Sequence, residues 1–145
     1  MIEIREGNVT RKYHKDMTQP TAPNSLFVFG SNTAGKHGAG SARAALQNYG
    51  AVYGEYLGPM GQSFALPTCD TAFAPLPLEV IQLYVDLLIE YATNHPDVEF
   101  FMTRTGCVRA GYTDQQIASM FLECQLTNFD YPEEWRSTLE SMVRR

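Results

Sequence analysis

The chain has 145 residues, of which 44% are hydrophobic and 19% are charged, and its formal net charge is -5. This length and composition predict one globular domain over residues 1–145 and exclude a disordered chain. The negative charge argues against nonspecific nucleic-acid binding as the main role. The longest apolar stretches are too short for a membrane helix and the N-terminus lacks the pattern of a signal peptide, so we expect a cytoplasmic protein.

The cysteines and histidines predict neither a disulfide framework nor a metal site. Cys69, Cys107 and Cys124 are odd in number and lack the CxxC spacing of metal or redox motifs, which is typical of a reducing compartment. The histidines at positions 14, 37 and 95 complete no recognisable metal-binding pattern with them. We therefore expect no bound metal and no cofactor.

The first 24 residues predict an edge strand, a turn and an irregular connection. Apolar and charged residues alternate over Ile2–Arg5, as in a half-exposed strand, and Gly7–Thr10 is expected to turn. Arg11–Asn24 is polar and contains two prolines, which favour an irregular segment. The basic residues at its start are expected to lie in a solvated loop: Arg11, Lys12, His14 and Lys15.

A strand, a glycine-rich loop and a helix then follow in direct succession. Leu26–Phe29 is wholly apolar, which predicts a buried central strand, and Ser41–Tyr49 predicts a helix. Glycines let the backbone approach a ligand closely, and the free N–H groups of a helix start attract anions. The loop between them is therefore a predicted anion site, with His37 as a further candidate because it has no obvious core role.

The middle of the chain predicts a loop, a short strand and a long helix. The glycine-rich segment 51–62 is expected to contain a hairpin-like part, and it could form either a lid or a subunit contact. Ser63–Pro67 predicts a short strand. Apolar residues recur at helical spacing over Pro77–Asn94, where Pro77 suits the first turn and Pro96 prevents a long continuation.

A second strand, glycine turn and helix unit lies in Val98–Phe121. The strand is predicted over Val98–Thr103 and the turn over Gly106–Gly111. Thr113 followed three residues later by Gln116 has the pattern of a capping box at a helix start. Two such loops at neighbouring strand ends suggest a ligand with several phosphates, or with a phosphate between two sugars.

Two arginines flank this second loop and have different predicted roles. We expect Arg104 to brace the loop and Arg109, inside it, to be the better phosphate ligand, because a guanidinium matches phosphate in a bidentate way. Further along, Asn128–Tyr131 predicts a short strand and Pro132–Met142 a helix with Trp135 on its apolar face, together with Leu139 and Met142. Strands that alternate with helices predict an α/β sheet with helices on both sides.

Four segments in this order resemble the macro domain family, which binds ADP-ribose, and above all its compact bacterial and phage macro-like members. They are IEIREGNVT, NTAGKHGAGSA, TRTGCVRAGYTDQQIASMF and NFDYPEEW. The resemblance implies an α/β fold, a three-layer α/β/α sandwich with a mixed central sheet, and a ligand across the carboxyl ends of the central strands. It also implies an ADP-ribose-type small molecule as the partner and a role in reading or sequestering a defence signal. Separately from the resemblance, a subunit contact through segment 51–62 would make the protein an oligomer.

The resemblance assigns roles residue by residue. Asn8 stands where the family usually has an aspartate that accepts from the adenine amine, and Asn32 matches an asparagine near the terminal ribose. Gly38–Gly40 matches the loop around that ribose and a phosphate. Gly106–Gly111 matches the loop around the diphosphate, and Tyr112 matches an aromatic residue that packs on a ribose. The predicted ligand-binding set is Asn8, Gly30, Ser31, Asn32, Gly35, His37, Gly38, Ala39, Gly40, Thr105, Gly106, Cys107, Val108, Arg109, Ala110, Gly111 and Tyr112.

Several members of this set have an ordinary structural alternative. Gly30 and Gly35 could serve only the turn from strand to helix, and Asn32 could form an Asx turn. Tyr112 could be a core residue, and Cys107 is expected to be a small buried filler.

The resemblance also bears on catalysis. One class of macro hydrolases has a lysine where this chain has Ala39, and glycohydrolases acting on acidic side chains use an aspartate where it has Ala110. The macro-like group often has a lysine where this chain has Cys69, and Val108 stiffens the second loop. Because alanine is neither a nucleophile nor a base, we expect a binding protein without that mechanism.

Two alternatives stay open. A hydrolase of ADP-ribose derivatives, such as an ADP-ribose 1''-phosphate phosphatase, would need a positioned water and a base, for which Asp70, His37 and Asp114 are candidates. A protein-interaction module that has lost its ligand is favoured only by Asn8 and Val108.

Overall fold

The computed structural model describes residues 10–16, 18–107 and 110–141, and its centre is a six-stranded sheet. The strand order is β1-β6-β5-β2-β4-β3, and every neighbouring pair is parallel except β3 and β4. The sheet is therefore mixed, and its parallel strands end at a common edge. The strands are β1 Lys12–His14, β2 Ser25–Asn32, β3 Gly58–Met60, β4 Ser63–Cys69, β5 Glu99–Met102 and β6 Phe129–Pro132.

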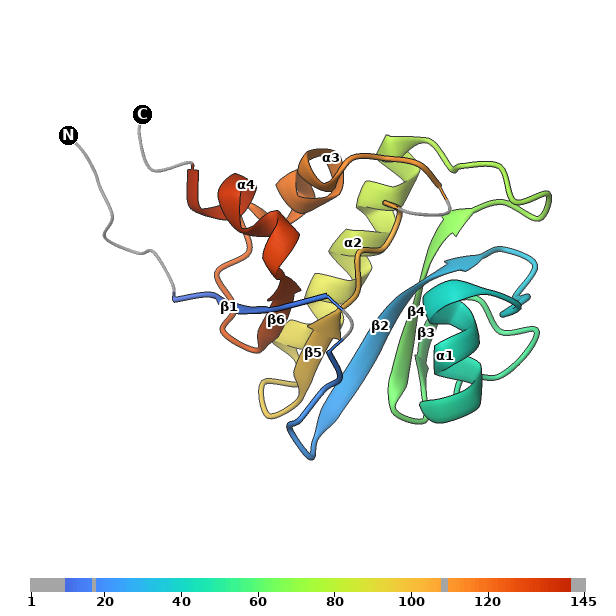
Figure 1. Cartoon of the computed structure of the whole chain (residues 1–145), viewed down its shortest axis with the longest axis horizontal. Coiled ribbons are helices and arrows are strands. Elements are labelled where there is room, and N and C mark those ends of the chain that lie inside the picture. Colours follow the sequence, from blue (N-terminus) through green and yellow to red (C-terminus); the bar gives the residue numbers. More distant parts are fainter. Residues whose placement is uncertain (1–9, 17, 108–109, 142–145) are drawn as a thin grey trace.

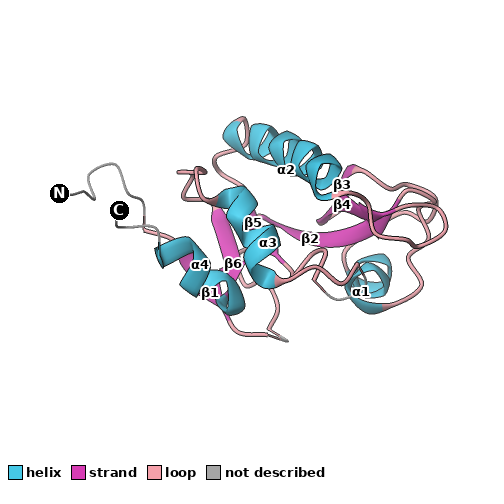
Figure 2. Cartoon of the chain, turned by 90° about the horizontal axis from the view of Figure 1, so that it is seen from above, coloured by secondary structure: helices cyan, strands magenta, loops and turns pink. Residues whose placement is uncertain are grey.

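Helices cover both faces of this sheet (Figures 1 and 2). α1, Gly40–Asn48, lies on one face. α2, Leu78–Thr93, lies on the other face together with two short helices, α3 Asp114–Ala118 and α4 Arg136–Glu140. Short 3-10 helices over Ser119–Phe121 and Glu133–Trp135 complete that side. The architecture is thus the α/β class that the sequence pattern predicts, with the mixed sheet that the family resemblance implies.

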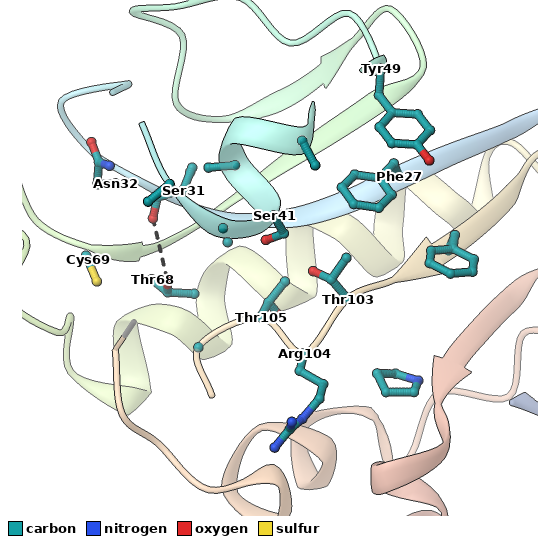
Figure 3. A pocket seen from close by; sticks show the side chains of 18 of the residues that line it. Phe27, Ser31, Asn32, Ser41, Tyr49, Thr68, Cys69, Thr103, Arg104 and Thr105 are labelled. Atoms are coloured by element: carbon teal, nitrogen blue, oxygen red, sulfur yellow. Dashed lines mark hydrogen bonds between the residues drawn. The ribbon is translucent and has the colours of Figure 1, made fainter. Parts of the chain in front are cut away.

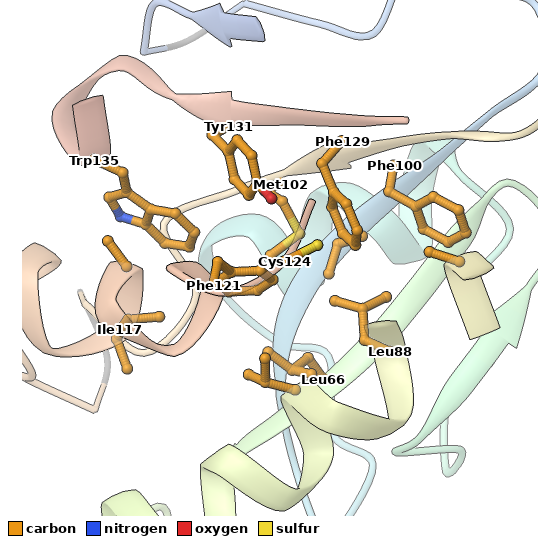
Figure 4. Packing of buried hydrophobic residues seen from close by; sticks show 14 of the residues in the cluster. Leu66, Leu88, Phe100, Met102, Ile117, Phe121, Cys124, Phe129, Tyr131 and Trp135 are labelled. Atoms are coloured by element: carbon orange, nitrogen blue, oxygen red, sulfur yellow. The ribbon is translucent and has the colours of Figure 1, made fainter. Parts of the chain in front are cut away.

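The larger core lies between the sheet and α2, α3 and α4 (Figure 4). α2 buries one stripe, made of Ile81, Val85, Leu88 and Ala92, because these residues recur at helical spacing. Aromatic side chains fill the part under the short helices, where Phe121 contacts Trp135 with ring centroids 5.5 Å apart. The other rings of this cluster are Phe100, Phe129 and Tyr131.

A smaller core lies under α1. On β2, Val28 belongs to the larger core while its neighbours Phe27 and Phe29 belong to the smaller one, because alternate residues of a strand face opposite sides. α1 contributes the small buried residues Ala42 and Ala45, which let the helix lie close to β2. Among the described helices only α1 contributes residues to this smaller core.

Most predicted elements are confirmed. The long helix, the helix after the first glycine loop, the hairpin of β3 with β4 and the strands β2, β4, β5 and β6 lie where the sequence places them, within one to three residues at each end. The helix predicted over Pro132–Met142 is wrong in its first part, because Pro132 ends β6 and Glu133–Trp135 is a 3-10 helix that precedes α4. The capping box at α3 is present, with Thr113 Oγ1 accepting from Gln116 N at 3.0 Å. The edge strand expected over Ile2–Arg5, most of the turn after it and Met142 lie outside the described residues.

The expectation of a solvated, irregular loop after residue 10 is wrong in its first part. Lys12–His14 is strand β1, which pairs in parallel with β6. Arg11 donates to the carbonyls of Leu139 and Leu122, both at 3.2 Å, and Lys12 forms an ion pair with Glu99. The side chains of Arg11 and Lys12 therefore form polar contacts within the fold. No helix within the described ranges is long and apolar enough to cross a membrane.

Candidate ligand-binding groove

A groove with a volume of about 1080 Å³ crosses the face of the sheet beside α1 (Figure 3). It passes over the carboxyl ends of β2, β4 and β5, which is where open α/β sheets hold their ligands. The N-terminal turn of α1 forms one wall, and residues 103–106 after β5 line the groove from the next strand. Phe27 and Phe101 lie in its floor.

The start of α1 meets the groove without a side-chain cap. The N-cap residue, Ala39, is extended and cannot cap with its side chain, and the first turn has no acidic residue. The N–H groups of that turn therefore have no intrahelical acceptor, and the positive end of the helix dipole lies at the groove. A Cβ built on Gly38 or Gly40 would meet no atom within 4 Å, so open space lies in front of these residues. Such an arrangement suits an anion.

Across the groove, Thr105 supplies a polar group in need of a partner. Its side chain is buried and lines the groove, and its Oγ1 has no hydrogen-bond partner among the described residues. Buried hydroxyls are nearly always hydrogen-bonded, so this atom is suited to a ligand. Gly106 follows with φ of +78°, and a Cβ there would lie 3.0 Å from Ile117 Cδ1, so the loop requires glycine at this point.

Two predicted residues of the first loop hold a neighbouring loop and do not line the groove. Gly35 has φ of +71°, and a Cβ on it would lie 2.4 Å from the carbonyl carbon of Gly54, whose N–H donates to Gly35 O at 2.7 Å. His37 is only 1% exposed and donates from Nε2 to Val52 O at 2.9 Å. Both contacts fix the segment 51–57 against the first loop.

Ser31 and Asn32 line the groove and also make local hydrogen bonds. Ser31 Oγ donates to Tyr56 O at 2.6 Å. The Asn32 side chain accepts from Lys36 N at 3.1 Å and donates to Lys36 O at 2.8 Å, which closes the loop. Both bonds reach four residues along the chain, so the arrangement is not the Asx turn considered for this residue. Gly30 lines the groove as well, and a Cβ there would crowd Thr68 Oγ1 at 3.2 Å.

Arg104 braces the second loop, as expected from the sequence. Its guanidinium donates to both carboxylate oxygens of Asp114 at the start of α3. Burial alone would raise the pKa of Asp114, but the hydrogen bonds and positive charge of Arg104 outweigh it and lower that pKa. The Asp114 hydrogen bond in turn raises the pKa of Arg104. Burial, followed by the negative charge of Asp114, raises the pKa of the nearby Cys107 thiol to about 12.

The remaining predicted residues lie away from the lining of the groove or outside the described ranges. Tyr112 donates its hydroxyl to Leu76 O at 2.6 Å, and Cys107, Ala110 and Gly111 do not line the groove either. Asn8, Val108 and Arg109 are not described, so their roles stay predictions. The three candidate bases are also outside the lining; Asp70 accepts from the N–H groups of Ala72 and Ala74 at 2.8 and 2.9 Å.

The sequence matches no family model and no curated protein. Its fold does match solved structures. The macrodomain of Mycobacterium tuberculosis DarG is 17% identical with a TM-score of 0.65, over 86% of this chain and 98% of that one. Two proteins from Bacteroides thetaiotaomicron, one described as of unknown function, are 13% and 12% identical with TM-scores of 0.60 and 0.57. They match 86% of this chain and 98% and 99% of their own chains.

The chain has a macrodomain fold. The identities are low, so the likeness is one of backbone arrangement, and it agrees with the resemblance drawn from four segments of the sequence.

In this macrodomain fold the floor of the groove is a row of aromatic rings that sequence analysis missed. His14 stacks on Phe101 with centroids 3.8 Å apart, and Phe27 stacks on Tyr49 with centroids 4.2 Å apart. Phe27 and Phe101 are register neighbours on β2 and β5, with nearly parallel rings 6.0 Å apart. His14 Nδ1 lies 2.8 Å from Asp130 Oδ1, which fixes the imidazole over the sheet. The row depends on strand pairing, which local sequence spacing does not reveal.

Proposed function

We propose that this protein binds ADP-ribose or a related NAD-derived nucleotide in the groove. The observation that carries the proposal is the uncapped start of α1, with open space in front of Gly38 and Gly40 and the unpartnered hydroxyl of Thr105 in the loop after the neighbouring strand β5. An anionic group there would accept from free backbone N–H groups and from Thr105.

The rest of the groove suits the other parts of such a ligand. The rings of His14 and Tyr49, which stack on the buried Phe101 and Phe27, line the groove and provide a surface for a nucleobase. In the proposed pose the diphosphate lies at the start of α1 and the base lies toward β6 and β1. The macrodomain fold and the resemblance to ADP-ribose-binding proteins support this pose.

Binding without hydrolysis is favoured by the positions of the candidate bases. His37, Asp70 and Asp114 each make hydrogen bonds that hold the fold. Ala39, which lies at the start of α1, has no group that could act as a nucleophile or base. A binding protein of this kind would read or sequester a nucleotide signal, and the resemblance to compact bacterial and phage macro-like proteins favours such a role in defence.

The test is a thermal-shift screen of the full chain with ADP-ribose, ADP-ribose 1''-phosphate, cyclic ADP-ribose and NAD⁺, followed by chromatography of each mixture. A ligand at about 100 times its Kd stabilises a protein by roughly 2.7 kcal/mol. For a chain of this size that corresponds to a rise in Tm of about 8 °C. We expect such a rise with the nucleotide unchanged. A new product would show an enzyme, and no rise with any nucleotide would overturn the proposal.

A further inference from the structure

The long helix α2 is apolar on its outer face as well as on the face that packs against the sheet. At the 3.6 residues per turn of an α-helix, Leu83 lies nearly opposite the centre of the buried stripe, and Leu87 lies one turn further on. These two residues are 63% and 48% exposed. A helix that covers one face of a sheet normally presents polar residues to water, and a helix that is apolar on both sides is normally covered on both. The outer face of α2 is therefore suited to a partner.

The same outer face carries three carboxylates and no positive charge. Glu79, Asp86 and Glu90 are exposed, and α2 contains no lysine or arginine. These acids recur at helical spacing along one side of the two leucines. Within the described ranges no ion pair involves any of them, and Asp86 Oδ1 accepts a hydrogen bond from Gln82 Nε2 at 3.0 Å. An apolar stripe with an acidic border thus runs along the helix.

One of these acids lies where a helix disfavours a negative charge. Glu90 is in the last turn of α2, and this turn has no basic residue. The helix dipole places partial negative charge at this end, so a carboxylate here is destabilising and a cation stabilising. A positive group supplied by a partner would therefore offset both the carboxylate and the dipole.

Charge decides among the occupants that an apolar helix face could take. In an antiparallel two-fold pair with a second copy, the acidic side of one α2 would lie beside the acidic side of the other, which is unfavourable. Membrane surfaces attract amphipathic helices with basic borders, and their anionic headgroups would repel these carboxylates. A basic segment of another protein suits both the leucines and the acids.

We propose that the outer face of α2 binds a basic amphipathic segment of a partner protein. Apolar side chains of that segment pack on Leu83 and Leu87, and its lysine or arginine side chains pair with Glu79, Asp86 and Glu90. An amphipathic helix laid on an apolar surface is a recurring mode of peptide recognition, and charges at the border set the choice of partner.

This surface is separate from the ligand-binding groove. α2 covers the face of the sheet opposite to α1, and the groove lies beside α1 (Figure 2). A segment bound to α2 would leave the start of α1 open, so the inference does not depend on the proposed function.

The probe is a labelled synthetic peptide with leucine and lysine at helical spacing, titrated against the full chain by fluorescence anisotropy. A second peptide with glutamate in place of lysine tests the sign of the charge. The double variant Leu83→Ser with Leu87→Ser removes the apolar contact without changing the net charge. Its matched control is Val52→Ser with Leu57→Ser, because these residues are 51% and 38% exposed at another place on the surface.

A second pair of variants separates local from overall electrostatics. Glu79→Gln with Glu90→Gln removes two charges from the α2 face. Glu55→Gln with Glu133→Gln removes two charges from exposed acids elsewhere, so both proteins have the same net charge. A basic peptide attracted only by the overall negative charge would respond equally to both.

We expect saturable one-to-one binding of the lysine peptide to wild type and none of the glutamate peptide. The serine variant of α2 should bind at least about tenfold more weakly. The glutamine variant of α2 should bind about fivefold more weakly. Both controls should stay within about twofold of wild type.

Three results would overturn the proposal. They are no binding of the lysine peptide, binding that survives both α2 variants, and an equal loss in the control variants. Sedimentation of wild type that shows a dimer abolished by the serine variant of α2 would assign the face to a second copy and would overturn it as well.

Discussion

Arg104 and Asp114 are joined by two hydrogen bonds, from Nε to Oδ1 at 2.9 Å and from Nη2 to Oδ2 at 2.7 Å. Trp135 Nε1 donates to the same carboxylate at 3.0 Å. The Asp114 carboxylate at the start of α3 therefore accepts hydrogen bonds both from the segment after β5 and from the aromatic core under the short helices. Because Thr105 and Gly106 directly follow Arg104, this link also positions the second wall of the groove.

Asp114→Ala should lower the free energy of unfolding by about 2 kcal/mol, because it leaves a guanidinium and an indole N–H without their acceptor. Urea denaturation measures the change. Glu90→Ala is the matched control, since Glu90 is an exposed acid on α2, and it should stay within about 0.5 kcal/mol of wild type. An Asp114→Ala variant as stable as the control would show that the link carries no stability.

The same carboxylate makes stability depend on acid pH. The pKa of Asp114 is lowered in the folded protein from its ordinary value of 3.8. Its contribution is therefore complete above that value and is lost as the pH falls through the lower folded pKa. The difference in unfolding free energy between wild type and Asp114→Asn should be constant from pH 7 to 5 and should shrink below about pH 4. A difference that grows on acidification would contradict the pairing.

The variant Thr105→Val tests whether the Thr105 hydroxyl binds a ligand or stabilises the fold. Without a ligand the variant should be as stable as wild type or slightly more stable, since it replaces an unpartnered buried hydroxyl with a methyl group of similar size. Its affinity for the bound nucleotide should fall, by about tenfold for one lost hydrogen bond to an anionic group. Thermal melts without ligand measure the stability of the free variant, and melts with ligand report its affinity. A loss of stability in the free protein would show that Thr105 is satisfied within the fold.

Cys107 should be an unreactive thiol. With a pKa of about 12 it is almost entirely protonated at neutral pH, and the thiolate is the reactive form. Cys69 and Cys124 are buried. We expect labelling by a disulfide reagent at pH 8 to be slow for all three cysteines and to accelerate only with unfolding in urea. A fast phase of one thiol per chain that disappears in Cys107→Ser would contradict this.

Much of the fold was predictable because its signals are local. The apolar run of β2, the helical spacing of α2 and the Thr113 capping box each predict a structure that the described residues contain. β1 was missed because its short run of residues has no apolar pattern: Lys12 pairs with Glu99, His14 is hydrogen-bonded to Asp130, and only Tyr13 packs against the larger core. Nothing within residues 11–15 themselves signals those partners.

The groove was predictable in part for the same reason. The glycine loop before α1 and the residues Thr105 and Gly106 were found because a strand followed by glycine and a helix predicts an anion site. The aromatic floor was missed because His14 and Phe101 meet only through the pairing of β1, β6 and β5. Gly35 and His37 share a loop with the groove residues, and only the three-dimensional arrangement shows that they contact the segment 51–57.

The most direct test of nucleotide binding is a calorimetric titration of ADP-ribose into wild type and Gly38→Val, with Ser137→Val on α4 as the control for added bulk. A Cβ on Gly38 meets no atom within 4 Å, so Gly38→Val should fold normally while filling the space in front of α1. We predict one-site binding to wild type and the control, and binding at least about tenfold weaker to Gly38→Val, a loss of roughly 1.4 kcal/mol or more. Equal binding to all three proteins, or no binding to wild type, would contradict nucleotide binding at the start of α1.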